Sequence, residues 1–63
     1  MTALSGLIRA RVSANLSQAT VGQVIGKTQS HYSKIERGII GLDAHDALTL
    51  CQYFGVGLEE LLK

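Results

Sequence analysis

The chain has 63 residues, 46% of them hydrophobic, with a net charge of +1 and a single cysteine. This length predicts one domain, residues 1–63, whose own core buries only ~60% of the surface of the unfolded chain. One cysteine excludes an intramolecular disulfide framework and favours a reducing compartment. No run approaches the ~20 apolar residues of a membrane span, and no signal-peptide core is evident, so we expect a cytoplasmic protein without a membrane partner.

The charge is divided unevenly along the chain. Residues 1–38 hold five Lys and Arg against one Glu, a net charge of +4, whereas residues 39–63 hold one Lys against four acidic residues, a net charge of −3. A split of this kind indicates that one half faces an anion and the other half faces away from it. An accidental division of solvated charges is the alternative.

Hydrophobic spacing predicts the first two helices. The first has apolar residues at helical spacing and ends near Asn15. The second begins after Ser17, a good N-cap, and ends before Gly26, where a left-handed residue stops a helix. The apolar residues are Leu4, Leu7, Ile8 and Ala14 in the first helix, and Val21, Gly22, Val24 and Ile25 in the second.

A third helix is expected after Thr28, its cap, and its main feature is a polar side. Steps of 100° per residue place five polar residues within an arc of about 140°. These residues are Gln29, Ser30, Ser33, Lys34 and Arg37. Tyr32 and Ile35 lie on the opposite side, and Gly38 ends the helix. The arc carries amide, hydroxyl and cationic groups without a central carboxylate, and such groups bond phosphates and base edges. An ordinary solvated face is the alternative.

Two further helices complete the chain. Asp43 caps a fourth helix that ends at Gly55, and the segment LEELLK at 58–63 turns Leu58, Leu61 and Leu62 inward. The apolar stripe of the fourth helix is Ala44, Ala47, Leu48, Leu50, Cys51 and Phe54. Because no segment alternates strictly for long enough to be a strand, we predict an all-α fold, a compact five-helix bundle with short connections.

The second and third helices predict a helix-turn-helix over about residues 18–37. Gly22 allows the two helices to cross closely, and the second helix of the pair points its polar arc outward. In this region and beyond, the chain strongly resembles the lambda-repressor-like, Cro-type (xenobiotic-response-element-like) helix-turn-helix family. The resemblance extends over residues 7–62, in the motifs LSQ at 16–18, GKTQSHYSKIERG at 26–38 and FGVGLEELL at 54–62.

The resemblance implies double-stranded DNA as the partner and a role for each matching residue. Base readout in the major groove falls to Gln29, Ser30, Ser33 and Lys34, and phosphate contact to Gln18, Lys27, Thr28 and Arg37. Arg11 and Glu36 match a structural pair that ties the first helix to the third in relatives. The function that follows is a sequence-specific transcriptional regulator, most simply a repressor.

The segment after Gly38 departs most from the family, because it is aliphatic where relatives are often basic and polar. Adjacent residues in an extended segment point in opposite directions, so Ile39 and Ile40 do not both cover the core. We therefore predict that one of them, with the outer side of the last helix, forms a homodimer interface, whose candidate residues are Ile39, Ile40 and Leu58. Such a dimer would hold two recognition helices about 34 Å apart, one turn of DNA. The alternative is that the loop folds back as a lid on the small core.

Other functions have little support in the sequence. Cys51 lies in an apolar stripe, and neither histidine has partners at metal-ligand spacing, so we expect no catalytic residues, no metal and no cofactor. Two alternatives share the fold: a DNA-binding antitoxin or restriction-modification controller that autoregulates its operon, and an adaptor that binds an unknown protein partner. An adaptor would carry an apolar or acidic face on the third helix, and this chain does not.

Overall fold

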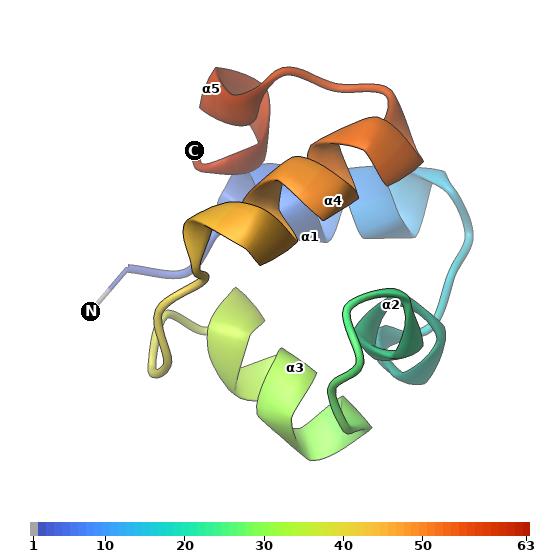
Figure 1. The fold of residues 1–63 in the computed structure, drawn as a ribbon, viewed down its shortest axis with the longest axis vertical. Coiled ribbons are helices and arrows are strands. Elements are labelled where there is room, and N and C mark those ends of the chain that lie inside the picture. Colours follow the sequence, from blue (N-terminus) through green and yellow to red (C-terminus); the bar gives the residue numbers. More distant parts are fainter. Residues whose placement is uncertain (1) are drawn as a thin grey trace.

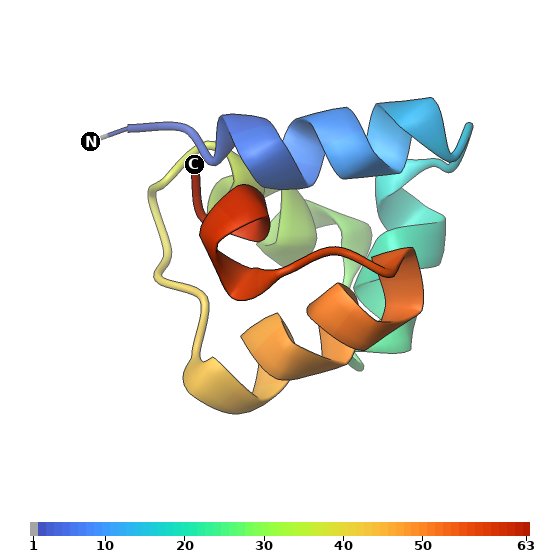
Figure 2. The ribbon, with the colours of Figure 1, turned by 90° about the horizontal axis from the view of Figure 1, so that it is seen from above.

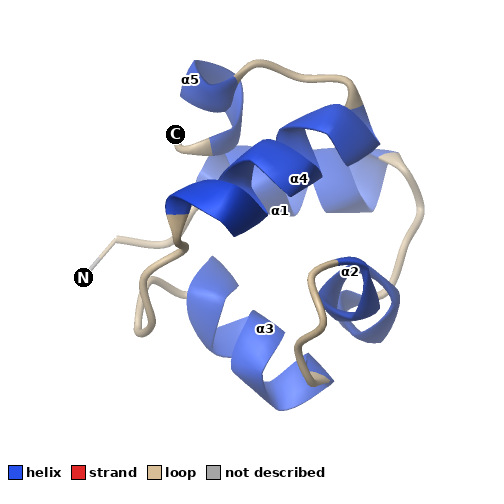
Figure 3. Cartoon of the chain, viewed as in Figure 1, coloured by secondary structure: helices blue, strands red, loops and turns tan. Residues whose placement is uncertain are grey.

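The computed structural model describes residues 2–63, and within them the chain forms five α helices and no strands (Figure 3). The helices are α1 (Ser5–Ser13), α2 (Gln18–Val24), α3 (Gln29–Glu36), α4 (Ala44–Phe54) and α5 (Leu58–Leu61). The predicted all-α, five-helix fold is confirmed. Overall extents of 24 × 24 × 21 Å make the bundle nearly isometric.

The helix boundaries follow from local side-chain chemistry. The predicted caps Ser17, Thr28 and Asp43 each accept a hydrogen bond from the backbone N–H three residues later, at 3.1, 3.1 and 2.8 Å. These bonds satisfy amide groups that have no partner inside the helix. At the other end of α3, Gly38 has a φ of +78°, and a Cβ there would lie 2.3 Å from the carbonyl oxygen of Thr2. Both the conformation and the space therefore require glycine.

The five helices surround a small core. In Figure 1, α2 and α3 lie at one end and α5 at the other, with α1 behind α4, and Figure 2 shows α1 along one side of the bundle. The largest fully buried side chains are Tyr32, Leu7, Ile35, Leu50, Leu61 and Val21, so every helix contributes to the core. Ile25 packs against it from the α2–α3 turn.

Close helix contacts depend on two glycines inside helices. At Gly22, a Cβ would lie 3.0 Å from the carbonyl oxygen of Lys27 and 3.2 Å from the Cβ of Tyr32, so the prediction that Gly22 permits a close crossing is confirmed. At Gly6, a Cβ would overlap the carbonyl oxygen of Glu60. Helix α5 therefore rests directly on the backbone of α1, a contact that the sequence pattern did not indicate.

Several residues predicted to be inside are exposed, and these predictions were wrong. Ala14, Ala44 and Leu48 face solvent, because α1 stops at Ser13 and the covered side of α4 is narrower than its apolar stripe. In α5 only Leu61 is buried, since a single helical turn can direct only one side to the core. Leu58 and Leu62 remain 43% and 44% exposed.

No helix within residues 2–63 is long and apolar enough to cross a membrane.

Candidate nucleic-acid interface

The polar arc of α3 is exposed, as the helical pattern predicted. Gln29, Ser30 and Lys34 are exposed, and so is Arg37, the C-cap residue of the helix, whereas Ser33 is half-buried. The opposite side of α3 packs into the core through Tyr32, Ile35 and Glu36. The structure thus brings the four predicted base-readout residues and Arg37 to one face.

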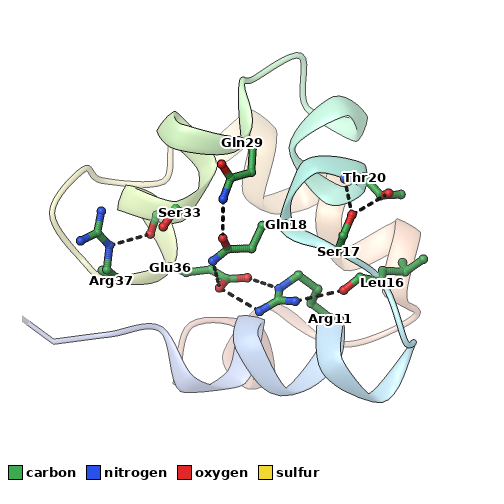
Figure 4. A network of polar contacts seen from close by, with 9 residues as sticks. All are labelled: Arg11, Leu16, Ser17, Gln18, Thr20, Gln29, Ser33, Glu36 and Arg37. Atoms are coloured by element: carbon green, nitrogen blue, oxygen red, sulfur yellow. Dashed lines mark hydrogen bonds and ion pairs between the residues drawn. The ribbon is translucent and has the colours of Figure 1, made fainter.

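A buried ion pair joins α1 to the core side of α3, opposite this face. The Nε atom of Arg11 donates to Oε2 of Glu36 at 2.6 Å, and its Nη2 atom donates to Oε1 of the same carboxylate at 3.3 Å. Nη1 donates to the carbonyl oxygen of Leu16 at 3.0 Å, which ties the loop before α2 to the same guanidinium (Figure 4). The side chains are only 16% and 3% exposed. The structural pair implied by the resemblance is present between α1 and α3.

The ionisation of this pair is set by opposing effects. Burial favours the neutral carboxyl, but the hydrogen bonds from Arg11 and Gln18 outweigh it and lower the pKa of Glu36. The hydrogen bond to Glu36 raises the pKa of Arg11. Nearby, burial raises the pKa of Tyr32, so its phenol stays neutral. The Tyr32 hydroxyl is buried and has no hydrogen-bond partner among the described residues.

Gln18 connects the buried pair to the surface. Its Nε2 atom donates to Oε1 of Glu36 at 3.0 Å, and its Oε1 atom accepts from Nε2 of Gln29 at 2.8 Å (Figure 4). The sequence suggested only a phosphate contact for Gln18, and this orienting contact to Gln29 was missed. With one N–H bound to Gln18, Gln29 retains its second N–H and its amide oxygen. A donor and an acceptor on one amide are the pair that recognises adenine in the major groove.

The predicted phosphate-binding residues occupy different surroundings. Thr28, exposed at the N-cap of α3, accepts from the N–H of His31 and keeps its hydroxyl proton for an outside acceptor. Arg37 donates from Nε to the carbonyl oxygen of Ser33 at 3.4 Å, and its side chain makes no other hydrogen bond or ion pair within residues 2–63. Lys27 instead lies 4.0 Å from Asp46 on α4, a partner that sequence spacing could not show because the two residues are 19 positions apart.

Ionic partners separate the cations of this chain into two groups. Within residues 2–63, four of the six Lys and Arg lie within 4.0 Å of a carboxylate: Arg9, Arg11, Lys27 and Lys63. The remaining two, Lys34 and Arg37, both lie on the exposed face of α3. The only acidic residue in residues 2–38 is Glu36, which is 2% exposed. The face of α3 is therefore cationic and free of exposed carboxylate.

Among the residues predicted for a dimer interface, two are exposed and one is not. Ile39 is 47% exposed and Leu58 is 43% exposed, whereas Ile40 is partly buried and packs against the core. The expectation that Ile39 and Ile40 differ is confirmed, and Ile40 contributes to the core rather than to a free surface.

Comparison with protein families identifies the family of the chain. A family described as helix-turn-helix (HTH_3) matches residues 7–61, nearly the whole chain. The chain belongs to the lambda-repressor-like helix-turn-helix family. No curated protein and no solved structure matches it significantly. As a member of this family, the protein is a DNA-binding helix-turn-helix regulator. Helices α2 and α3, over which the sequence predicts the helix-turn-helix, are joined by a short turn at residues 25–28.

Proposed function

We propose that this helix-turn-helix regulator is a repressor that binds an operator of two half-sites as a homodimer, with α3 in the major groove. The observation that carries the proposal is the position of Lys34 and Arg37, the two cations without a carboxylate partner in residues 2–63, on a helix face that exposes no carboxylate. Such a face attracts the phosphate backbone of DNA, and it exposes no carboxylate that would repel the phosphates. Gln29, held by Gln18, supplies a rigid amide for base recognition on the same face.

The base-readout set in this proposal is Gln29, Ser30, Ser33 and Lys34, and the phosphate set is Gln18, Thr28 and Arg37. Lys27 is left out, because it lies beside Asp46. Each short recognition helix covers only a few base pairs, so useful specificity requires two half-sites. The proposed two-fold interface contains Ile39 and Leu58, both large, apolar and exposed. A two-fold interface must be complementary to itself, and an apolar patch meets this condition because it can pack against its own copy.

Selection from a random pool of duplexes, followed by binding measurements from 50 to 200 mM salt, tests DNA recognition. Arg37, the only cation of the phosphate set, neutralises one phosphate per protomer and gives an expected slope of log K against log salt of about −0.9 per half-site. A slope near zero on every selected duplex would remove the DNA-binding proposal. Arg37→Ala should flatten the slope by ~0.9 and weaken all sequences about equally.

Sedimentation of Ile39→Lys and Ile40→Lys tests the dimer. Charge at an interface residue should shift the protein to monomer and weaken binding to a two-half-site operator far more than to a single half-site. Ile40→Lys is the matched comparison, because Ile40 packs on the core and its replacement should chiefly lower the melting temperature. If Ile39→Lys leaves both association and operator binding unchanged, the dimer interface is elsewhere.

A further inference from the structure

The contact between Lys27 and Asp46 joins the helix-turn-helix to α4. Lys27 lies in the turn between α2 and α3, and Asp46 lies in the first turn of α4. Their side chains are 34% and 12% exposed, and Nζ is 4.0 Å from Oδ2. This distance exceeds that of an N–H···O hydrogen bond, so the pair is held by charge attraction alone. The ammonium group of Lys27 donates no hydrogen bond to any atom of residues 2–63.

Lys27 also stands next to the surface that DNA would contact. It directly precedes Thr28, the N-cap of α3, where the free amide groups and the helix dipole favour an anion. A lysine is a compact charge on a flexible four-carbon stem with three donors. A phosphate can satisfy those donors, whereas Asp46 at 4.0 Å does not. The two anions would therefore attract the same ammonium group.

We propose that Asp46 competes with DNA phosphate for Lys27, and that this internal ion pair withholds from DNA a cation beside the start of the recognition helix. The proposal rests on the proposed DNA-binding function. Lys27 is the third cation of the helix-turn-helix, beside Lys34 and Arg37. Because Asp46 neutralises it, Lys27 does not add to the exposed positive charge of α3. Asp46 thereby limits the affinity of the protein for phosphate, including phosphate of the wrong sequence.

Four proteins test this competition: wild type, Lys27→Met, Asp46→Asn and the double variant, each bound to one selected single half-site duplex from 50 to 200 mM salt. In the Asp46→Asn background, Lys27→Met should flatten the slope of log K against log salt by ~0.9, the value of one phosphate. In the wild-type background, the same substitution should leave the slope nearly unchanged. Asp46→Asn should tighten binding about two- to fivefold when Lys27 is present, the range expected for release of a weak ion pair.

Two results would overturn the proposal. Equal tightening by Asp46→Asn with and without Lys27 would mean that removing a negative charge acts through the general field of the protein. A slope change of ~0.9 for Lys27→Met already in the wild type would mean that Lys27 binds phosphate whether or not Asp46 is there. Glu59→Gln is the control for charge removal and should leave the slope unchanged. Glu59 is an exposed residue of α5, which lies at the far end of the molecule from α3 (Figure 1).

The wild-type slope in the same series keeps the two proposals separate. A clear slope in wild type with no coupling between Lys27 and Asp46 would leave DNA binding intact and remove only the competition. Melting temperatures establish that each variant is folded. Asp46→Ser, which also removes the carboxylate, is measured beside Asp46→Asn and stands in for it if that variant does not fold. Agreement between Asp46→Asn and Asp46→Ser would show that the lost charge, and not the new side chain, is responsible.

Discussion

The side-chain amides of Gln18 and Gln29 are joined by a hydrogen bond of 2.8 Å from Nε2 of Gln29 to Oε1 of Gln18. Gln18 also donates to the buried carboxylate of Glu36, which Arg11 neutralises. The exposed side chain of Gln29 on α3 is thus oriented by Gln18, which is itself bound to the buried Glu36. Fewer rotamers remain to be lost when Gln29 meets a base, so the arrangement favours both affinity and selectivity.

The first prediction is that Gln18 and Gln29 act together in DNA recognition. Gln29→Ala should cost ~1–3 kcal/mol of binding at a particular base pair. Gln18→Ala should weaken binding to all sequences and also relax the same base preference, because Gln29 loses its orienting partner. A double-mutant cycle should give a coupling free energy of ~0.5–3 kcal/mol. Strict additivity would show that the hydrogen bond does not persist on DNA.

The second prediction concerns the stability of the Arg11–Glu36 pair. Arg11→Met leaves the Glu36 carboxylate buried without its counter-ion and should lower the free energy of unfolding by ~3–5 kcal/mol in urea titration. The double variant Arg11→Met with Glu36→Met should recover much of that loss, since two apolar side chains replace two buried charges. A double variant as unstable as the single one would mean that packing, and not the unpaired charge, dominates.

The third prediction is a loss of stability in acid. Because the pKa of Glu36 is lower in the folded protein than in the unfolded chain, the ionised carboxylate stabilises the fold at any pH above the unfolded value of ~4.3. That contribution is lost as the pH falls through the folded pKa. Urea unfolding from pH 7 to pH 2 should show this decline, and Glu36→Gln, although less stable at pH 7, should show a smaller one.

The fourth prediction concerns Gly6, where α5 meets α1. Alanine normally stabilises a helix interior by ~1 kcal/mol relative to glycine. Here the new Cβ would overlap the carbonyl oxygen of Glu60 on the backbone of α5, so Gly6→Ala should instead destabilise the protein by ~1–3 kcal/mol. The matched control is Gly41→Ala, where no atom lies within 4 Å of the added Cβ. Thermal melting of the two variants checks the difference, and equal stability would contradict the close helix contact.

The fifth prediction is that Tyr32→Phe stabilises the fold by ~1 kcal/mol. The Tyr32 hydroxyl is buried near the Glu36 carboxylate, but no atom of the described residues meets the geometry of a hydrogen bond to it. An unsatisfied buried polar group costs free energy. Phenylalanine keeps the aromatic ring that is buried in the core, so DNA binding should not change. Urea unfolding provides the measurement, and a loss of stability would show that the hydroxyl makes a hydrogen bond in solution.

The sequence by itself determined the features that depend on near neighbours. Caps at Ser17, Thr28 and Asp43 are made by residues three positions apart, and the polar arc of α3 follows from 3.6 residues per turn. Motif resemblance added the Arg11–Glu36 pair and the family. These features were readable because a short stretch of chain, or a recognised pattern, contains all the information that sets them.

Only the tertiary structure decided which distant residues meet. Helix α4 brings Asp46 to Lys27, the close approach of α5 demands Gly6, and packing of the loop after α3 buries Ile40 while leaving Ile39 exposed. Likewise, the apolar periodicity of α4 and α5 could not tell Leu61, which is buried, from Leu48 or Leu58, which are not. Periodicity shows which side of a helix is apolar, but how much of that side is covered depends on the neighbouring helices, whose positions are fixed only when the core packs.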